Sequence, residues 1–180
     1  RHWNIGPKSK VAVVGLGGLW HMAIKLAHAL GAEVTLFTRS PDKEQDARDL
    51  GADHVVLSTD KNQLKAVKNQ YDLNIDTVPY DHDLKPYIPT LALSGTLVLV
   101  GYLGEFSTNS VPMIMGRKSI AGTVIGGIQE TQELLDFCGE HTLVSAVEMI
   151  DMQTINEAYE RMLKSDVKYR FVIDLKSLKD

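Results

Sequence analysis

The chain has 180 residues, 44% of them hydrophobic, which is enough to bury one substantial core. Its net charge of -4 gives no electrostatic basis for binding nucleic acid or an anionic membrane, and no apolar run approaches a membrane span or a signal peptide. We therefore expect neither nucleic acid nor membrane as a partner. The single cysteine, Cys138, excludes an internal disulfide framework and fits a cytoplasmic location. Because the chain begins with Arg1, we expect it to be a fragment or a processed product.

A strand, a glycine turn and a helix open the chain. Residues 10–14 are apolar and β-branched, which predicts a buried strand, and helix-forming residues from 21 to 30 follow a glycine-rich turn. This order is typical of a dinucleotide-binding βαβ unit. Glycine suits the tight turn and lets the backbone approach a pyrophosphate, which then faces the N–H groups of the helix start. The cofactor-binding residues predicted here are Gly15, Gly17, Gly18 and Leu19.

Trp20 departs from this motif, which has a small residue at its third position. Two interpretations remain open. The turn binds a dinucleotide and the indole limits the affinity, because a ring beside the phosphates needs room. Alternatively, the glycines only form a turn in an α/β fold that binds no nucleotide.

Strands and helices alternate along the rest of the first 144 residues. We expect strands at 33–38, 53–57, 71–78, 95–101 and 119–124. Helices are expected from 41 to 50, 61 to 70 and 83 to 93, and two prolines should kink the last of them. A loop that contains a proline and several methionines precedes the last strand. Such alternation predicts a doubly wound, six-stranded parallel sheet of the Rossmann type with helices on both faces.

The C-terminal part continues with a helix and a strand–helix–strand segment. A helix at 130–141 is amphipathic, with its apolar residues expected inside. A strand at 147–150, a helix at 154–164 and a strand at 171–174 follow. We divide the chain into a nucleotide-binding domain, 1–144, and a C-terminal segment, 145–180. The residues expected on the buried side of the helix are Leu134, Leu135, Phe137 and Cys138.

The end of the second strand indicates which dinucleotide is bound. NAD sites usually have an acid there, which accepts hydrogen bonds from the ribose hydroxyls, whereas this chain has Thr38-Arg39-Ser40 and then Lys43. A carboxylate would repel a 2′-phosphate, while hydroxyls and cations would hold one. We therefore predict NADP(H). The alternative is that Arg39 and Lys43 are solvated surface charges.

Later strand ends meet the same crevice, since ligands of open α/β sheets lie beyond the carboxyl ends of the strands. Gly101 and Gly122 either let the backbone approach the nicotinamide or serve only turns. The residues predicted to bind cofactor here are Thr77, Val78, Val100, Gly101, Gly122 and Thr123.

No metal site or catalytic residue is predicted within the chain. One cysteine cannot form a zinc-type CxxC pair, and adjacent residues such as Asp81-His82-Asp83 do not easily converge on one ion. We expect that tripeptide to be a helix N-cap and loop.

Several stretches together resemble one family over essentially the whole chain. They are Arg1-His2-Trp3 with Gly6-Pro7, 14–19, 21–27, 50–53, 125–127 with 130–133, 155–162 and 166–174. In these the chain is similar to the cofactor-binding half of zinc-dependent medium-chain alcohol dehydrogenases, in the cinnamyl-alcohol-dehydrogenase-like branch, and in particular to bacterial NADP-dependent aldehyde reductases.

The resemblance implies a parent that interconverts alcohols and aldehydes by hydride transfer with NADP(H), with a catalytic zinc as Lewis acid. It implies that all zinc ligands lie in a catalytic domain outside this chain and that the C-terminal segment packs toward that domain. It also implies that Thr38, Ser40 and Lys43 hold the 2′-phosphate. A homodimer is expected through the edge strand 119–124, because this edge is uncharged and because the family implies it. The rival hypothesis is a non-catalytic nucleotide-sensing domain, which Trp20 favours.

Overall fold

The computed structural model describes residues 2–15, 17–164 and 166–178, and the chain divides into two compact units, Arg1–Leu143 and Val144–Asp180. Each unit is described by itself. None of the helices in the described ranges is both long and apolar enough to cross a membrane.

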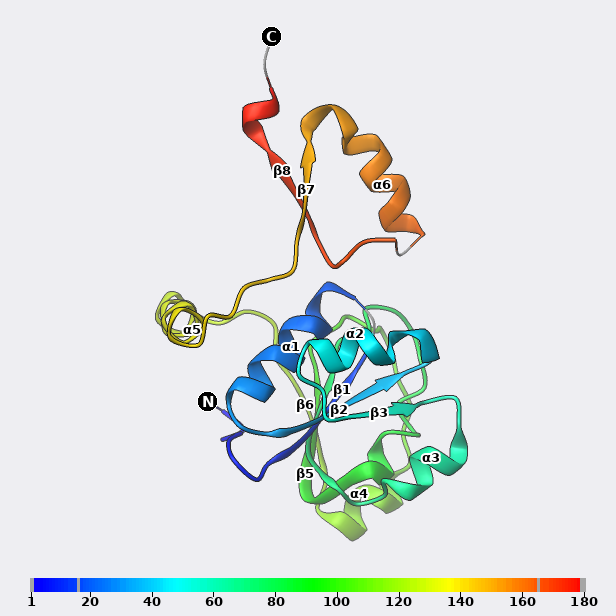
Figure 1. Ribbon diagram of the computed structural model, residues 1–180. Helices are drawn as coiled ribbons and strands as arrows, with labels where there is room; N and C mark the ends of the chain where they lie inside the picture. Colours follow the sequence, from blue (N-terminus) through cyan, green and yellow to red (C-terminus); the bar gives the residue numbers. More distant parts are fainter. Residues whose placement is uncertain (1, 16, 165, 179–180) are drawn as a thin grey trace. The chain divides into compact units, whose positions relative to one another are not determined.

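The first unit contains a six-stranded sheet in the order β3-β2-β1-β4-β5-β6, and all five neighbouring pairs are parallel. The chain runs outward from β1 to β3 and then returns past β1 to β4, which places helices on both faces. Figure 1 shows α1 and α2 on one side of the sheet and α3 and α4 on the other. The predicted Rossmann architecture is thereby confirmed. The strands are β1 (Lys10–Val14), β2 (Glu33–Thr38), β3 (His54–Leu57), β4 (Tyr71–Asp76), β5 (Leu91–Leu99) and β6 (Ser119–Gly122), and the helices are α1 (Gly18–Ala29), α2 (Glu44–Asp49), α3 (Lys61–Ala66), α4 (Ser110–Gly116) and α5 (Ile128–Glu140).

The core lies on both faces of the central strands. Residues 11–14 of β1 are buried, as expected of a parallel strand covered on each side. Phe37 at the end of β2 packs edge-on against Tyr71 and stacks on Tyr87, with ring centroids 5.3 and 5.7 Å apart. These aromatic contacts join β2, the first residue of β4 and the segment after β4.

Trp20 lies inside this core. Its side chain is 0% exposed, and it shares the buried side of α1 with Ile24 and Ala27, at the spacing of one helix face. The helix is therefore rotated so that the indole faces the protein interior. The structure thus shows how a bulky residue is accommodated at the third motif position, and the effect of Trp20 on cofactor affinity stays a prediction.

The helix predicted for residues 83–93 is wrong. Only a short 3₁₀ turn forms there, η2 (Ile88–Thr90), and β5 begins directly after it. Pro86 and Pro89 lack the N–H groups that an α-helix needs. The apolar residues that suggested a helix instead anchor an irregular segment, since Leu84 and Ile88 are almost completely buried.

β5 starts earlier than predicted because Ser94 and Gly95 form an irregularity within the strand. Ser94 has a φ of 65°, and the register with β4 shifts at this point. A Cβ on Gly95 would lie 2.7 Å from the Tyr71 carbonyl oxygen, so the two backbones approach too closely for a side chain. In the sequence, Ser-Gly is typical of a turn between elements, and only the pairing with β4 shows that the strand passes through it.

Two smaller differences concern helices. The segment predicted as a loop around Pro112 contains α4, which Asn109 caps by accepting a hydrogen bond from the Val111 N–H at 2.9 Å. In α5 no described residue is buried, although an inside face was expected; Leu134 is 45% and Leu135 60% exposed. The other strand ends lie within two residues of their predicted limits, and β2 matches its predicted limits at both ends.

The second unit is a small βαβ unit. β7 (Glu148–Asp151) pairs in parallel with β8 (Phe171–Asp174), and α6 (Ile155–Leu163) connects them. Arg161 on α6 is paired with Glu148 at 2.7 Å and with Asp166 at 3.0 Å, and its guanidinium lies 4.8 Å from the centroid of the Phe171 ring. This arginine therefore links the helix to both strands.

Candidate cofactor site

A pocket of about 210 Å³ lies at the carboxyl ends of the strands, where ligands of open α/β sheets bind. It is lined by the ends of β1 (Val14 and Gly15), β2 (Phe37, Thr38 and Arg39) and β3 (Ser58 and Thr59), and by part of the segment from Val78 to Tyr87 that follows β4. Of the predicted cofactor residues, this pocket brings together Gly15, Thr38, Arg39 and Val78.

Two glycines in the turn between β1 and α1, Gly15 and Gly17, have different surroundings. Gly15 has a φ of 123°, and a Cβ there would collide with the hydroxyl of Thr77, which donates to the Val14 carbonyl oxygen at 2.8 Å. At Gly17, the N-cap of α1, no atom of the described residues beyond its chain neighbours lies within 4 Å of the Cβ position. Gly15 is therefore needed by the fold, whereas Gly17 leaves open space at the start of the helix, where Gly18 is the first residue.

The end of β2 carries the groups predicted to hold a 2′-phosphate. The buried Thr38 hydroxyl oxygen accepts from the Ser40 N–H at 3.1 Å and lies 3.4 Å from the Ser40 carbonyl oxygen, so it shapes the turn. The Lys43 ammonium pairs with Asp46 at 3.5 Å. Arg39 is exposed, and within the described residues its guanidinium makes no hydrogen bond or ion pair. Arg39 is therefore the cation at this strand end that is most available to a ligand.

Other predicted residues lie elsewhere. Leu19, Thr77 and Val100 line a separate apolar groove of about 400 Å³ beside α1. Gly101 lies against the Val78 carbonyl group, where a Cβ would collide with the backbone, so its immediate role is to let two strand ends approach. A Cβ on Gly122 would make an ordinary van der Waals contact with the Leu99 carbonyl oxygen at 3.9 Å, and Thr123 donates its N–H to the same oxygen at 3.1 Å.

Residues at the end of β3 and after β4 line the pocket but were missed by the sequence analysis. The rule that strand ends converge already indicates the end of β3. The prediction of a helix at 83–93 concealed Asp83, Pro86 and Tyr87, because a helix there would have been assigned to the outer layer. Tyr80 and His82 precede that range. The missed residues are Ser58, Thr59, Tyr80, His82, Asp83, Pro86 and Tyr87.

The buried Asp76 and the partly exposed His82 form a pair next to this pocket. Asp76 at the end of β4 is 0% exposed; its Oδ1 accepts from the Val78 N–H at 3.0 Å, and its Oδ2 lies 2.8 Å from Nε2 of His82. Nδ1 of the same ring lies 2.9 Å from the Tyr80 carbonyl oxygen. Burial raises the pKa of the Asp76 carboxyl, while the Val78 N–H and the His82 ring oppose this rise. The tripeptide 81–83 is thus a loop, as expected, but the helix it was expected to cap is not formed, and its histidine has a specific partner.

Comparison with known proteins identifies the family. The family model described as zinc-binding dehydrogenase matches residues 18–140, which include α1 through α5. The chain belongs to the zinc-binding dehydrogenase family. This confirms the resemblance inferred from the sequence motifs.

The relatives of this zinc-binding dehydrogenase chain are about twice its length. It is 49% identical over 179 residues to the probable formaldehyde dehydrogenase AdhA of Bacillus subtilis, covering 99% of this chain and 51% of that protein. It is 51% identical over 182 residues to the aldehyde reductase YahK of Escherichia coli, covering 100% of this chain and 52% of that protein. The chain therefore spans about half the length of the curated relatives it matches.

Solved structures of cinnamyl alcohol dehydrogenases have the same fold as this chain. A cinnamyl alcohol dehydrogenase of Sorghum bicolor superimposes with a TM-score of 0.92 at 40% identity, covering 97% of this chain and 50% of that one. A Helicobacter pylori CAD complexed with NADP(H) gives a TM-score of 0.84 at 37% identity, with the same coverage of both chains.

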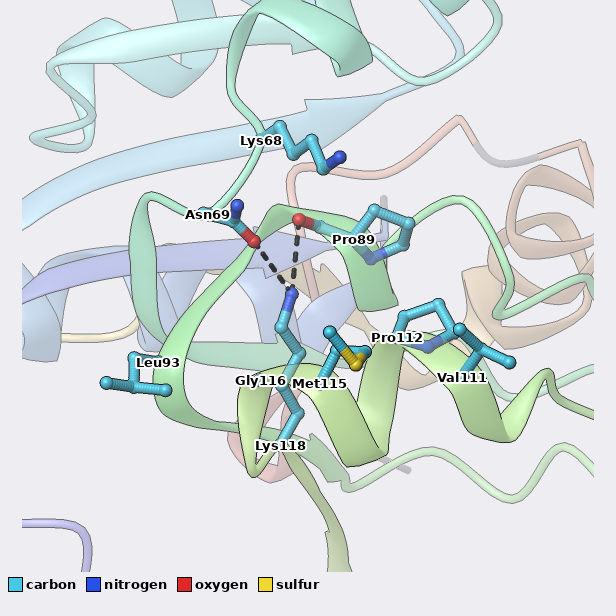
Figure 2. Close-up of a pocket in the computed structure, with 9 residues that line it drawn as sticks. All are labelled: Lys68, Asn69, Pro89, Leu93, Val111, Pro112, Met115, Gly116 and Lys118. Atoms are coloured by element: carbon cyan, nitrogen blue, oxygen red, sulfur yellow. Dashed lines mark hydrogen bonds between the residues drawn. The ribbon is translucent and has the colours of Figure 1, made fainter.

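A larger pocket, of about 580 Å³, lies at the opposite, amino ends of β5 and β6 in this zinc-binding dehydrogenase chain. Figure 2 shows the buried Lys118 side chain pointing toward Asn69 and Pro89. Its ammonium donates to Asn69 Oδ1 at 3.0 Å and to the carbonyl oxygens of Ile88 and Pro89 at 3.1 and 3.3 Å. Burial, with a smaller contribution from Lys68, lowers the pKa of this ammonium. Because all three ammonium protons have acceptors, we assign Lys118 a structural role.

No group of three or more histidine, cysteine, aspartate or glutamate side chains is arranged to hold a metal ion among the residues that the structure describes.

Proposed function

We propose that this chain is the NADP(H)-binding half of an oxidoreductase that interconverts alcohols and aldehydes by hydride transfer. The observation that carries the proposal is the pocket at the ends of β1 and β2, with Arg39 free of ion pairs in the described structure and no acid at the end of β2. Asp83, the acid that lines the pocket, comes from the segment after β4 and accepts a hydrogen bond from the Lys85 N–H at 3.0 Å. The names of relatives support the same cofactor and reaction, among them the NADP-dependent alcohol dehydrogenase C 1 of Mycolicibacterium smegmatis.

The residues of the site fit a dinucleotide phosphate. The space at Gly17 and the N-terminus of α1 suit the pyrophosphate, since helix N-termini present N–H groups and a positive dipole to anions. Arg39 and the Ser40 hydroxyl suit the 2′-phosphate, with Lys43 adding charge that Asp46 partly neutralises. The bound cofactor would supply the hydride. This chain's residues would bind it and distinguish the phosphorylated form.

We propose that the zinc which polarises the carbonyl is held outside this chain and that residues 145–180 pack toward that other part of the protein. A binding experiment and the gene together test the proposal. Calorimetry should show NADPH binding to the chain. The gene segment preceding Arg1 should encode a cysteine, a His-Glu pair and a four-cysteine lobe. NADPH binding without such a segment would instead support the nucleotide-sensing hypothesis.

The isolated chain should bind cofactor but reduce no aldehyde. Without a Lewis acid beside the nicotinamide, the carbonyl is not activated for hydride transfer. We expect NADPH consumption with a panel of aldehydes and added zinc to equal that of a heat-denatured control. Activity well above that control, and lost in an Arg39→Asp variant, would contradict the proposal.

We further propose a homodimer through the β6 edge. β6 pairs with β5 on one side only, no charged residue lies between Lys118 and Glu130, and Val124 and Ile125 are 89% and 85% exposed. Light scattering should show a dimer that Val124→Lys dissociates, while Leu175→Lys, at an exposed apolar residue of the second unit, leaves it intact. A monomer at high concentration would count against this interface.

The remaining parts of the proposal concern the protein's surroundings. The substrate class is alcohols and aldehydes, which fits the printed names of the relatives. The single cysteine supports a cytoplasmic location.

A further inference from the structure

Both ring nitrogens of His82 face oxygen atoms. Nδ1 lies 2.9 Å from the Tyr80 carbonyl oxygen, which can only accept a hydrogen bond, so Nδ1 must carry a hydrogen. Nε2 lies 2.8 Å from Oδ2 of Asp76. The other oxygen of Asp76 already accepts from the Val78 N–H, which orients Oδ2 toward the ring.

These contacts determine the number of protons. A neutral imidazole with hydrogen on Nδ1 has a bare Nε2, which would face an ionised carboxylate lone pair to lone pair. A contact of 2.8 Å therefore requires one more proton, either on Nε2 as an imidazolium or on Oδ2 as a carboxylic acid. In both forms the pair as a whole is neutral, and removing the proton leaves one negative charge on a fully buried group.

The pair ties the segment after β4 to the sheet. Asp76 ends β4, whereas His82 lies within the segment whose residues Val78, Tyr80, Asp83 and Tyr87 also line the cofactor pocket. The His82 ring lies edge-on to the rings of Tyr80 and Tyr87, with centroids 6.5 and 6.4 Å apart. Breaking the contact would thus release one wall of the pocket.

We propose that the hydrogen bond formed by the proton between Asp76 and His82 holds the segment 78–87 in place as a wall of the cofactor site. That the ligand of this site is a dinucleotide cofactor rests on the proposed function. His82 is a positioning residue, since it acts through the segment that it holds.

The bridge makes dinucleotide binding depend on pH. Loss of the proton leaves a buried negative charge beside a pocket meant for an anionic ligand and removes the hydrogen bond that holds the wall. Other ionisable groups lie near the pair. Asp83, Tyr80, Tyr87 and Arg39 line the cofactor pocket with His82, and Asp81, Lys85 and Glu105 line a second, more open pocket with it. Because one proton is involved, the Kd should rise at alkaline pH by up to tenfold per pH unit.

The proton itself can be observed without cofactor by ¹⁵N–¹H NMR of the histidine rings. At pH 7 we expect a proton in the His82–Asp76 contact and a second one on Nδ1. His54 is a matched control, because its Nε2 lies 3.3 Å from Glu33 but its side chain is 59% exposed. A bare Nε2 on His82 together with an ionised Asp76 would overturn the inference.

Binding of NADPH and of NADH at pH 7 to 9 tests the positioning role. The affinity for each dinucleotide should fall as the pH rises. Because NADH lacks the 2′-phosphate, a fall in its affinity cannot come from titration of that phosphate. In Asp76→Asn the amide can donate to a neutral His82 ring and still accept from the Val78 N–H. We therefore expect affinity within about threefold of the parent chain at pH 7 and no weakening toward pH 9, while His54→Gln keeps the parent slope. Thermal melts confirm that each variant is folded.

The outcomes separate the two proposals. A dinucleotide that binds with a flat pH profile, or an Asp76→Asn variant that keeps the slope, overturns the positioning role and leaves the proposed function intact. If neither dinucleotide binds at any pH although NMR shows the bridge, the proposed function and the cofactor role of the bridge both fail.

Discussion

Replacing Trp20 with alanine should lower the free energy of unfolding by about 3–5 kcal/mol, the typical cost of deleting a fully buried aromatic side chain. The indole is 0% exposed and lies on the face of α1 that packs on the sheet. For a chain of this size the loss corresponds to a melting temperature lower by roughly 6–20 °C. Urea and thermal unfolding measure it. Leu19→Ala, one residue earlier and 50% exposed, is the control and should change stability by less than about 1 kcal/mol.

Trp20→Gly extends this test to the cofactor. It should destabilise the chain further, because glycine in a helix costs roughly 1 kcal/mol relative to alanine. The sequence motif also predicts tighter NADPH binding, since a small residue at this position lets the helix start approach the phosphates. Calorimetry well below the melting temperature separates the two effects. A dissociation constant that stays the same or rises would show that the core accommodates the ring at no cost to the cofactor site.

Arg39→Asp should abolish the preference for NADP over NAD. One charge-assisted contact contributes on the order of 1.5–3 kcal/mol, so Arg39 on the 2′-phosphate should provide about tenfold or more preference. Aspartate removes the attraction and repels the phosphate, and it can accept hydrogen bonds from ribose hydroxyls, so preference should move toward NAD. The ratio of the two dissociation constants, measured by calorimetry, is the readout.

A matched control for this substitution is Arg48→Gln. Arg48 on α2 is already paired with Glu44 at 2.8 Å and does not line the pocket, so the ratio should stay at the parent value. If Arg39→Asp also leaves the ratio unchanged, Arg39 is a solvated surface charge. Recognition of the phosphate would then depend on Ser40 and Lys43, or be absent.

The sequence by itself determined the order of the strands, the glycine turn after β1 and the absence of an acid at the end of β2. These features are local: apolar runs, glycine at a positive φ and the residue types at a strand end are readable within a few positions. Gly15 is an example, because the tight turn that its pattern predicts is the one that the structure contains.

Only the tertiary structure decided the features that depend on contacts between distant segments. The direction of Trp20 depends on how α1 packs on the sheet, and the course of residues 83–90 depends on two prolines and on buried anchors that a helical pattern concealed. The Asp76–His82 pair likewise joins a strand end to a loop that the sequence treats as independent. Packing and hydrogen bonding between such segments are set by the whole fold, so residue types and spacing within one segment could not have predicted them.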